Sequence, residues 1–390
     1  MNRHIASLML IVSILFYCIP VNAAKVDVVE NEWTFFVYIC GSDLESGSTS
    51  GYAGDNISEM INGSRGTDIR FVVEAGGSNC QNGYFSNDET RRYVIEDGQI
   101  DQVGKDTLMD MGEGDTLREF LKWGTTSYPA EHMAVVIWDH GGGAMLGCCW
   151  DEIYYGSSMS LKEINDAFAG VTAGMDGKFD IIAFDCCSMG CIELAEILAP
   201  YGDYFIASEE LIPATGYNYE TLAEYIIENP DCDPVDVGTA LCETYISESE
   251  EMYEEYDLSL TISMTDLNAV EDFDNAFDEF CSGLGDPSQD DDEYNYFLSN
   301  MSGESDFDSG VYDLYTFTNA YADHLSGADE VNSAIDDMII YAYGGDDDGD
   351  YCGLSVFVPI HSLTDEERET FSYICPSEDL EQYALAFPWI

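Results

Sequence analysis

Apolar segments of strand length alternate with segments of helical periodicity along the amino-terminal half of this chain. The strand-like segments are Trp33–Cys40, Ile69–Val73, Met133–Trp138, Ile181–Phe184 and Tyr204–Ala207. The helix-like segments lie between them, at Thr116–Thr125, Leu161–Ala169 and Cys191–Leu198. Short apolar runs are typical of strands buried on both faces, and strands that alternate with helices usually form a parallel sheet. We therefore expect an α/β fold, with a mostly parallel sheet flanked by helices.

The carboxyl-terminal part carries fewer strand-like segments. Leu258–Met264 is expected to form one further strand, and residues 266–343 are expected to form helices joined by acidic loops. A last apolar segment, Leu354–Val358, is expected to return to the same sheet. This pattern predicts a core over residues 24–265 and an extension over residues 266–390 within one domain. A separate sheet for Leu354–Val358 would count against the single domain.

The first 23 residues have the features of a secretory signal peptide. A basic start precedes the apolar run Ile5–Ile19, and Pro20 and the small residues of 21–23 follow. The run is shorter than the roughly 20 residues that a membrane-spanning helix needs. We therefore leave residues 1–23 out of the fold, and expect the mature protein to be secreted or extracellular without a membrane contact.

The chain is strongly acidic, with 77 Asp and Glu residues against 12 Lys and Arg residues and a formal net charge of −65. Such a charge repels phosphate backbones, so we expect no nucleic-acid partner. Two interpretations stay open: a solvated, self-repelling surface, or a field that attracts cationic substrates.

Of the 13 cysteines, Cys18 falls in the signal segment. An export compartment permits disulfides, but the sequence leaves their connectivity open. Neither Cys148-Cys149 nor Cys186-Cys187 has the spacing of a zinc ribbon or a thioredoxin-type couple, so metal and redox functions have little support.

Two successive strand-like segments end in residues that can carry out chemistry. Met133–Trp138 leads into Asp139-His140 and then Gly141–Gly143, whereas Ile181–Phe184 leads into Asp185 and the pair Cys186-Cys187 before a helix. Because the carboxyl ends of parallel strands meet at one edge of a sheet, His140 and a cysteine are expected to share a crevice.

This combination suits a cysteine nucleophile. His140 can take the thiol proton and return one to a leaving amine, and Gly141–Gly143 leave backbone N–H groups accessible to an oxyanion. The positive end of the following helix is expected to lower the pKa of the thiol. A buried structural cysteine and a surface histidine are the alternatives, but their joint occurrence at two strand ends favours catalysis.

Trp138–Gly143 followed by Phe184–Gly190 resembles the clostripain family of cysteine peptidases, in the clan that also contains caspases, gingipains and legumain. Further segments agree, namely Trp33–Tyr38 with Asp43-Leu44, Leu117–Trp123, Tyr128–Ala130, Ala207–Glu210, Leu258–Leu267 and Gly353–Pro359. The resemblance covers nearly the whole mature chain. It implies a caspase-like sheet, a catalytic core over residues 24–265 and a secreted cysteine endopeptidase.

The resemblance places Cys187 at the position of the nucleophile. The family pattern has Ala before the nucleophile and Leu after it, where this chain has Cys186 and Ser188. It implies a dyad in which Cys187 attacks the scissile carbonyl and His140 carries the proton, while the N–H groups of Gly141 and Cys187 bind the oxyanion. Asp139 is expected to be structural.

The resemblance also implies a substrate-binding carboxylate. In the resembling enzymes an Arg or Lys before the scissile bond is held by an Asp two positions before the nucleophile, which is Asp185 here. Basic-specific relatives carry a second acid where this chain has Thr215, and Glu209 and Glu210 are the other acidic candidates. We therefore expect cationic protein or peptide substrates, cleaved after Arg or Lys. The alternative for Asp185 is a turn-forming residue that caps the next helix.

Relatives often mature by cleavage after a basic residue between the His and Cys motifs. Here residues 141–177 contain only Lys162, within a predicted helix, so self-cleavage is not expected. No cofactor is expected, although the acidic run Asp346–Asp350 could hold calcium without matching an EF-hand loop. An inactive binding or adhesion protein on the same fold, and a hydrolase of non-peptide amides, stay open as alternative functions.

Overall fold

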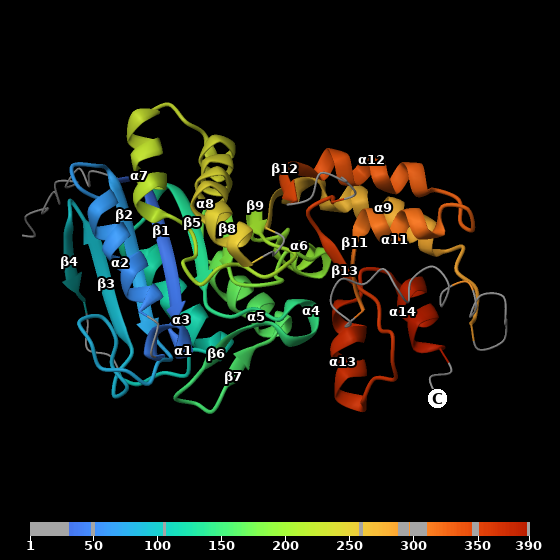
Figure 1. The fold of residues 1–390 in the computed structure, drawn as a ribbon, viewed down its shortest axis with the longest axis horizontal. Helices are drawn as coiled ribbons and strands as arrows, with labels where there is room; N and C mark the ends of the chain where they lie inside the picture. Colours follow the sequence, from blue (N-terminus) through green and yellow to red (C-terminus); the bar gives the residue numbers. More distant parts are fainter. Residues whose placement is uncertain are drawn as a thin grey trace, which may run out of the picture. The chain divides into compact units, whose positions relative to one another are not determined.

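The centre of the fold is a nine-stranded sheet whose five middle strands are parallel (Figure 1). The strand order is β12 (Ile339–Gly344), β10 (Thr261–Asp266), β9 (Gly202–Ala207), β8 (Phe179–Asp185), β5 (Ala130–Trp138), β1 (Asn31–Cys40), β2 (Ile69–Gly76), β3 (Arg91–Glu96) and β4 (Gln99–Gln102). The pairings at both edges are antiparallel. All five strands expected in the amino-terminal half form the parallel centre, so the predicted fold class is confirmed.

Helices cover both faces of this sheet because successive side chains of a buried strand point to opposite faces. In β1, Phe36 and Tyr38 join one apolar core and Phe35 and Val37 join the other. The first core is completed by α3 (Gly114–Ser127), α5 (Leu161–Thr172) and α6 (Ile192–Leu198) and by the carboxyl-terminal helices. The second is completed by α2 (Tyr52–Gly63), α7 (Tyr219–Glu228) and α8 (Pro234–Tyr256).

Local sequence signals explain where these helices begin. Ser160 precedes α5, its Oγ accepts a hydrogen bond from Glu163 N at 3.3 Å, and Ser160 N donates to Glu163 Oε2 at 2.9 Å. This reciprocal capping box satisfies N–H groups that would otherwise lack partners at the start of the helix. The predicted helices at 116–125, 161–169 and 191–198 are all present.

The carboxyl-terminal part is mostly helical, as expected, but a different strand returns to the sheet. Its helices are η1 (Leu267–Ala269), α9 (Val270–Cys281), α11 (Leu314–Tyr321), α12 (Ala328–Met338), α13 (Asp365–Ile374) and α14 (Glu378–Leu385). The returning strand is β12, which pairs with β10. The prediction for Leu354–Val358 is wrong, because β13 (Ser355–Phe357) pairs with β11 (Val311–Asp313) in a separate two-stranded sheet.

Contacts with the turn before α6 explain the position of β13. Ser355 N donates a hydrogen bond to Gly190 O at 2.9 Å, and Phe357 N donates to Glu193 Oε1 at 2.7 Å. The segment therefore satisfies its backbone against the start of α6 instead of the edge of the large sheet.

The structure is a computed structural model and describes residues 31–47, 51–103, 107–256, 260–287, 296, 310–344 and 351–387. The predicted signal segment and the acidic run Asp346–Asp350 lie outside the described residues. The chain from Asn31 onward forms one compact unit. Within the described ranges, no helix combines the length and the apolar composition required to cross a lipid bilayer.

Candidate active site

The register of two neighbouring strands brings the predicted catalytic segments together. β5 and β8 are parallel, and Trp138 at the end of β5 is paired with Asp185 at the end of β8. His140 and Cys187 therefore leave the sheet side by side, as predicted. Both line one pocket of about 170 Å³, together with Asp139, Asp185 and residues 211–214 and 216 of the loop opposite.

The Cys187 thiol is half-buried and is held by the backbone of the loop opposite. Ile212 N donates a hydrogen bond to Sγ at 3.3 Å, and the thiol donates to Ile212 O at 3.8 Å. Burial raises the pKa of Cys187, the nearby Asp185 carboxylate raises it further, and the Ile212 N–H opposes both. The expectation that α6 lowers this pKa is wrong, because burial has the larger effect. A raised pKa favours the neutral thiol of Cys187 over the thiolate.

The His140 ring is oriented by a carboxylate from α1 (Ser42–Ser46). Its Nε2 lies 2.9 Å from Asp43 Oδ1, and the ring packs edge-on against Trp150. With Nε2–H donated to Asp43, the nitrogen left for proton transfer is Nδ1. The sequence analysis noted Asp43 only as part of a matching segment. Its place directly after the first strand is the signal that could have identified it.

Gly141 lies against the backbone of the nucleophile. A Cβ at this position would lie 2.0 Å from Cys187 O, so no side chain fits there. This close approach places the Gly141 backbone next to the residue that would attack a carbonyl. Gly142 N donates to Gly147 O at 2.8 Å and is therefore engaged within α4 (Gly143–Leu146) and its cap. Of these two glycines, Gly141 is the better oxyanion candidate.

The first cysteine of the pair, Cys186, faces the core. Cys186 is fully buried and its thiol donates to Ile137 O at 3.4 Å. It also contacts the thiol of Cys148, which is itself buried beside Cys149 in β6 (Cys148–Asp151). β6 pairs with β7 (Ser157–Met159). Cys187, and not Cys186, is therefore the cysteine that reaches the pocket.

Asp185 contributes a buried carboxylate to the pocket of Cys187. Its Oδ2 accepts hydrogen bonds from Tyr217 N at 2.9 Å and Tyr219 Oη at 3.1 Å. Oδ1 accepts no hydrogen bond from any residue that the structure describes. A Cβ at Gly216 would lie 2.5 Å from Oδ2, so the glycine keeps the carboxylate uncovered. Burial raises the pKa of Asp185 to about 7, and the charge of Glu59 adds to this effect.

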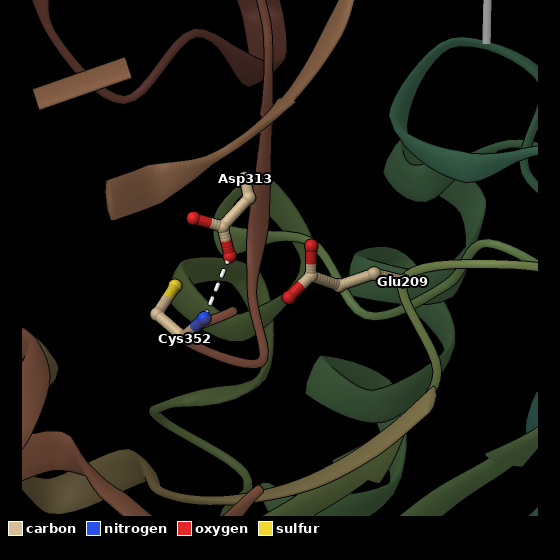
Figure 2. A group of neighbouring side chains, drawn as sticks. All are labelled: Glu209, Asp313 and Cys352. Carbon is tan, nitrogen blue, oxygen red and sulfur yellow. Dashed lines mark hydrogen bonds between the residues drawn. The ribbon is translucent and has the colours of Figure 1, made fainter. Parts of the chain in front are cut away.

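The other predicted substrate-binding residues lie outside this pocket. Thr215 lines an adjoining cavity with Asn56 and Glu59, and its carbonyl accepts from Asn56 Nδ2 at 2.9 Å. Glu210 O accepts from Ser188 N at 2.8 Å, so its backbone supports the nucleophile turn. The Glu209 carboxylate faces Asp313 and Cys352 (Figure 2). Sequence reasoning missed Glu59, whose negative charge raises the pKa of Asp185. Glu59 lies on α2, far from Asp185 in the sequence.

Within the described part of the chain, one group of side chains could hold a metal ion. It consists of Glu209, Asp313 and Cys352. Their ligand atoms lie within 4.8 Å of one another. Asp313 caps α11 and accepts from Thr316 N at 3.1 Å and Cys352 N at 2.8 Å, the latter drawn in Figure 2. Cys352 donates to Leu354 O at 3.2 Å. These contacts explain Asp313 and Cys352 as structural groups, separate from the pocket of Cys187.

Asp139 has the contacts of a structural carboxylate. It is buried, accepts from Ser42 Oγ at 2.6 Å through Oδ1, and accepts from Trp150 N at 2.6 Å through Oδ2. These bonds tie α1 and β6 to the end of β5, and so support the loop that carries His140. Burial raises the pKa of Asp139 to about 7.

The buried carboxyls predict an unusual pH dependence of stability. Burial raises the pKa of Asp139, Asp185, Glu59 and Glu193 to about 7 each, from ordinary values near 4. The folded state therefore binds more protons than the unfolded state between about pH 4 and pH 7, and its stability falls as pH rises through that window. We expect a higher Tm at pH 5 than at pH 8 in scanning calorimetry.

Matched variants separate this effect from general charge repulsion. Asp139→Asn should flatten the pH dependence, whereas Glu224→Gln, at an exposed position of α7, removes the same charge and should leave the slope unchanged. A stability that is constant or rises between pH 5 and pH 8 would contradict the assignment.

Comparison with known proteins agrees with this geometry. A model of the clostripain family matches residues 37–386. Clostripain from Hathewaya histolytica is 24% identical over 167 residues, which are 35% of this chain and 31% of clostripain. The chain thus matches about a third of the length of that relative.

Two solved structures are similar in fold. A secreted C11 cysteine protease from Bacteroides thetaiotaomicron, in complex with an irreversible peptide inhibitor, superposes with a TM-score of 0.67 and 18% identity over 91% of this chain and 99% of the other. An inactive zymogen C11 protease from Parabacteroides distasonis gives 0.64 and 17%, over 89% and 99%. The predicted resemblance is confirmed: because the family match extends over residues 37–386, the chain belongs to the clostripain family.

Proposed function

We propose that the protein is an exported endopeptidase that cleaves after Arg or Lys with Cys187 as nucleophile and His140 as base. One observation carries this proposal. Asp185 shares the pocket of Cys187, and within the described residues its Oδ1 accepts no hydrogen bond. A buried carboxylate with a free oxygen is a strong partner for a guanidinium or ammonium group.

The mechanism begins from the neutral thiol. His140 takes the Cys187 proton through Nδ1 as the sulfur attacks the scissile carbonyl, while Asp43 stabilises the ring at Nε2. The N–H groups of Gly141 and Cys187 stabilise the oxyanion. His140 then returns the proton to the leaving amine, and a water molecule hydrolyses the thioester. Asp43 acts through His140 and is a positioning residue.

Several charges favour a cationic residue before the scissile bond. A bound guanidinium would compensate Asp185, and Glu59 behind it raises the negative potential of the pocket. The net charge of −65 steers cationic peptides toward the enzyme, an effect that weakens as salt is added. Membership of the family leads us to expect protein and peptide substrates. The preference for Arg or Lys before the scissile bond is proposed from the charges of this pocket.

Other elements of the proposal concern maturation and localisation. We propose that residues 1–23 are removed on export and that residues 24–265 and 266–390 act as one domain. The separate sheet of β11 and β13 counts against a single domain, but the compactness of the chain from Asn31 onward supports it.

Two basic residues lie between His140 and Cys187. Lys162 is exposed but lies in the first turn of α5, and the partly buried Lys178 donates to Ala199 O at 2.8 Å, so we propose that the active protein remains a single chain there. The reaction is proposed to need no metal ion.

Profiling a peptide library tests the proposal, because it measures activity and specificity together. We expect cleavage after Arg and Lys that is reduced by added salt and retained in the presence of EDTA. A preference for an acidic, Asn or large apolar residue before the bond would rule out the basic pocket. Loss of activity with EDTA, restored by calcium, would contradict metal independence.

A further inference from the structure

A second cavity, of about 270 Å³, begins two residues after His140 and one residue after Cys187. The first pocket is lined by His140 and Cys187, whereas the second is lined by Gly142, Gly143 and Ser188. The remaining wall comes from α4 and from the small sheet of β11 and β13.

The two cavities lie along the same two backbone segments, which follow His140 and Cys187. A Cβ at Gly141 would meet Cys187 O at 2.0 Å, and one at Gly143 would meet Ser188 O at 3.2 Å. The two segments therefore run in close contact from the first cavity to the second. Ser188 has a φ of 59°, a left-handed conformation that is uncommon outside glycine and turns the chain sharply after Cys187.

The second cavity is apolar. Ala144, Leu146, Val311 and Phe357 line it, and none of its lining residues is charged. Leu146 is 63% exposed at its rim, and Leu211, which lines the catalytic pocket, is 51% exposed. A concave, mostly apolar cavity beside the proposed nucleophile is a candidate binding site for part of a ligand. This apolar wall contrasts with the 77 acidic residues of the chain.

We propose that this second cavity binds an apolar side chain in the leaving half of the substrate, at the first or second residue after the scissile bond. The inference rests on the proposed endopeptidase function. His140 must reach the leaving amine, and the chain that follows it, Gly142 and Gly143, forms a wall of the cavity. A peptide held with its basic residue over Asp185 and its carbonyl at Cys187 would therefore continue toward Leu146.

Paired substrates separate this inference from the function on which it rests. The first is an arginyl coumarin amide, which has no residue after the bond and reports the chemical step alone. The second is a set of quenched peptides with a fixed Arg before the bond and Leu, Phe, Gly or Asp at each of the next two positions. We expect Leu or Phe to be preferred over Gly and Asp by about tenfold or more at one of these positions.

Variants on the two walls locate the effect. Leu146→Ser and, on the opposite wall, Val311→Thr should each reduce the ratio of Leu to Gly, measured as kcat/KM. Ile227→Ser, at an exposed apolar side chain of α7 outside both cavities, should leave the ratio and the coumarin rate unchanged. A coumarin amide that is cleaved while the peptides show no apolar preference would overturn the inference alone. Failure on both substrate types would overturn the proposed function, and the inference with it.

Discussion

Replacing Cys187 by Ala should lower kcat/KM for an arginyl peptide amide by roughly 10⁴-fold or more, as loss of the nucleophile does in other covalent hydrolases. Cys186→Ala should retain most of the activity, although Cys186 is adjacent in sequence. The physical reason is position: Cys187 lines the pocket with His140, whereas Cys186 is buried and donates to Ile137 O. The rates are to be measured with one fluorogenic substrate on both variants.

A thiol-reactive peptide probe provides an independent readout. An arginyl probe should label Cys187 in the folded, reduced enzyme and in Cys186→Ala, and should fail to label Cys187→Ala. Thermal unfolding of each variant shows whether the fold is intact, which matters because Cys186 fills part of the core. An active Cys187→Ala protein, or an inactive but folded Cys186→Ala protein, would contradict the assignment of the nucleophile.

If Cys187 and His140 act as the proposed dyad, their resting contacts imply a rearrangement before the chemical step. The Cys187 thiol is bonded to the Ile212 backbone, and His140 is bonded to Asp43. A neutral thiol with a raised pKa is a weak nucleophile until a base removes its proton. Entry of the substrate between His140 and the loop at 211–214 would replace the Ile212 contact and bring the reacting groups together.

The parallel centre of the fold and the shared pocket of His140 and Cys187 could be predicted because their signals are local. Each apolar run fills one buried strand, and His140 and Cys187 directly follow the ends of β5 and β8. The returning strand could not be predicted in the same way. β12 has alternating half-buried and exposed side chains, a weak signal for an edge strand, whereas Leu354–Val358 is an apolar run buried against α6.

The remaining residues of the site come from segments that carry no catalytic motif. Asp43 follows the first strand, Glu59 lies on α2, and Ile212 contributes only its backbone. Their positions depend on how α1, α2 and a loop pack at one edge of the sheet. Thr215, the position of the second acid in basic-specific relatives, lines the same cavity as Glu59. The acid that influences Asp185 is Glu59, which lies on α2 and is distant from Asp185 in the sequence.

Asp185→Asn should lower kcat/KM for arginyl substrates by about 10²-fold. Removing one member of a buried, hydrogen-bonded charge pair typically costs about 2–5 kcal/mol of binding free energy. Asn keeps an oxygen that can accept from Tyr217 N and Tyr219 Oη, so the pocket should stay folded. Citrulline, the neutral isostere of arginine, serves as the reference residue before the bond. The ratio of arginine to citrulline cleavage cancels the shared chemistry of Cys187 and His140.

The pH dependence of this ratio tests the charge of Asp185 directly. Because burial raises its pKa to about 7, the carboxyl is largely protonated below that value and binds a guanidinium poorly. In the wild-type enzyme the arginine to citrulline ratio should therefore rise with pH toward a plateau above about pH 7. In Asp185→Asn the ratio should be low and independent of pH, whereas Glu209→Gln, outside the pocket, should behave as wild type. An unchanged ratio in Asp185→Asn would remove this residue from substrate recognition and leave the acidic surface as the source of any basic preference.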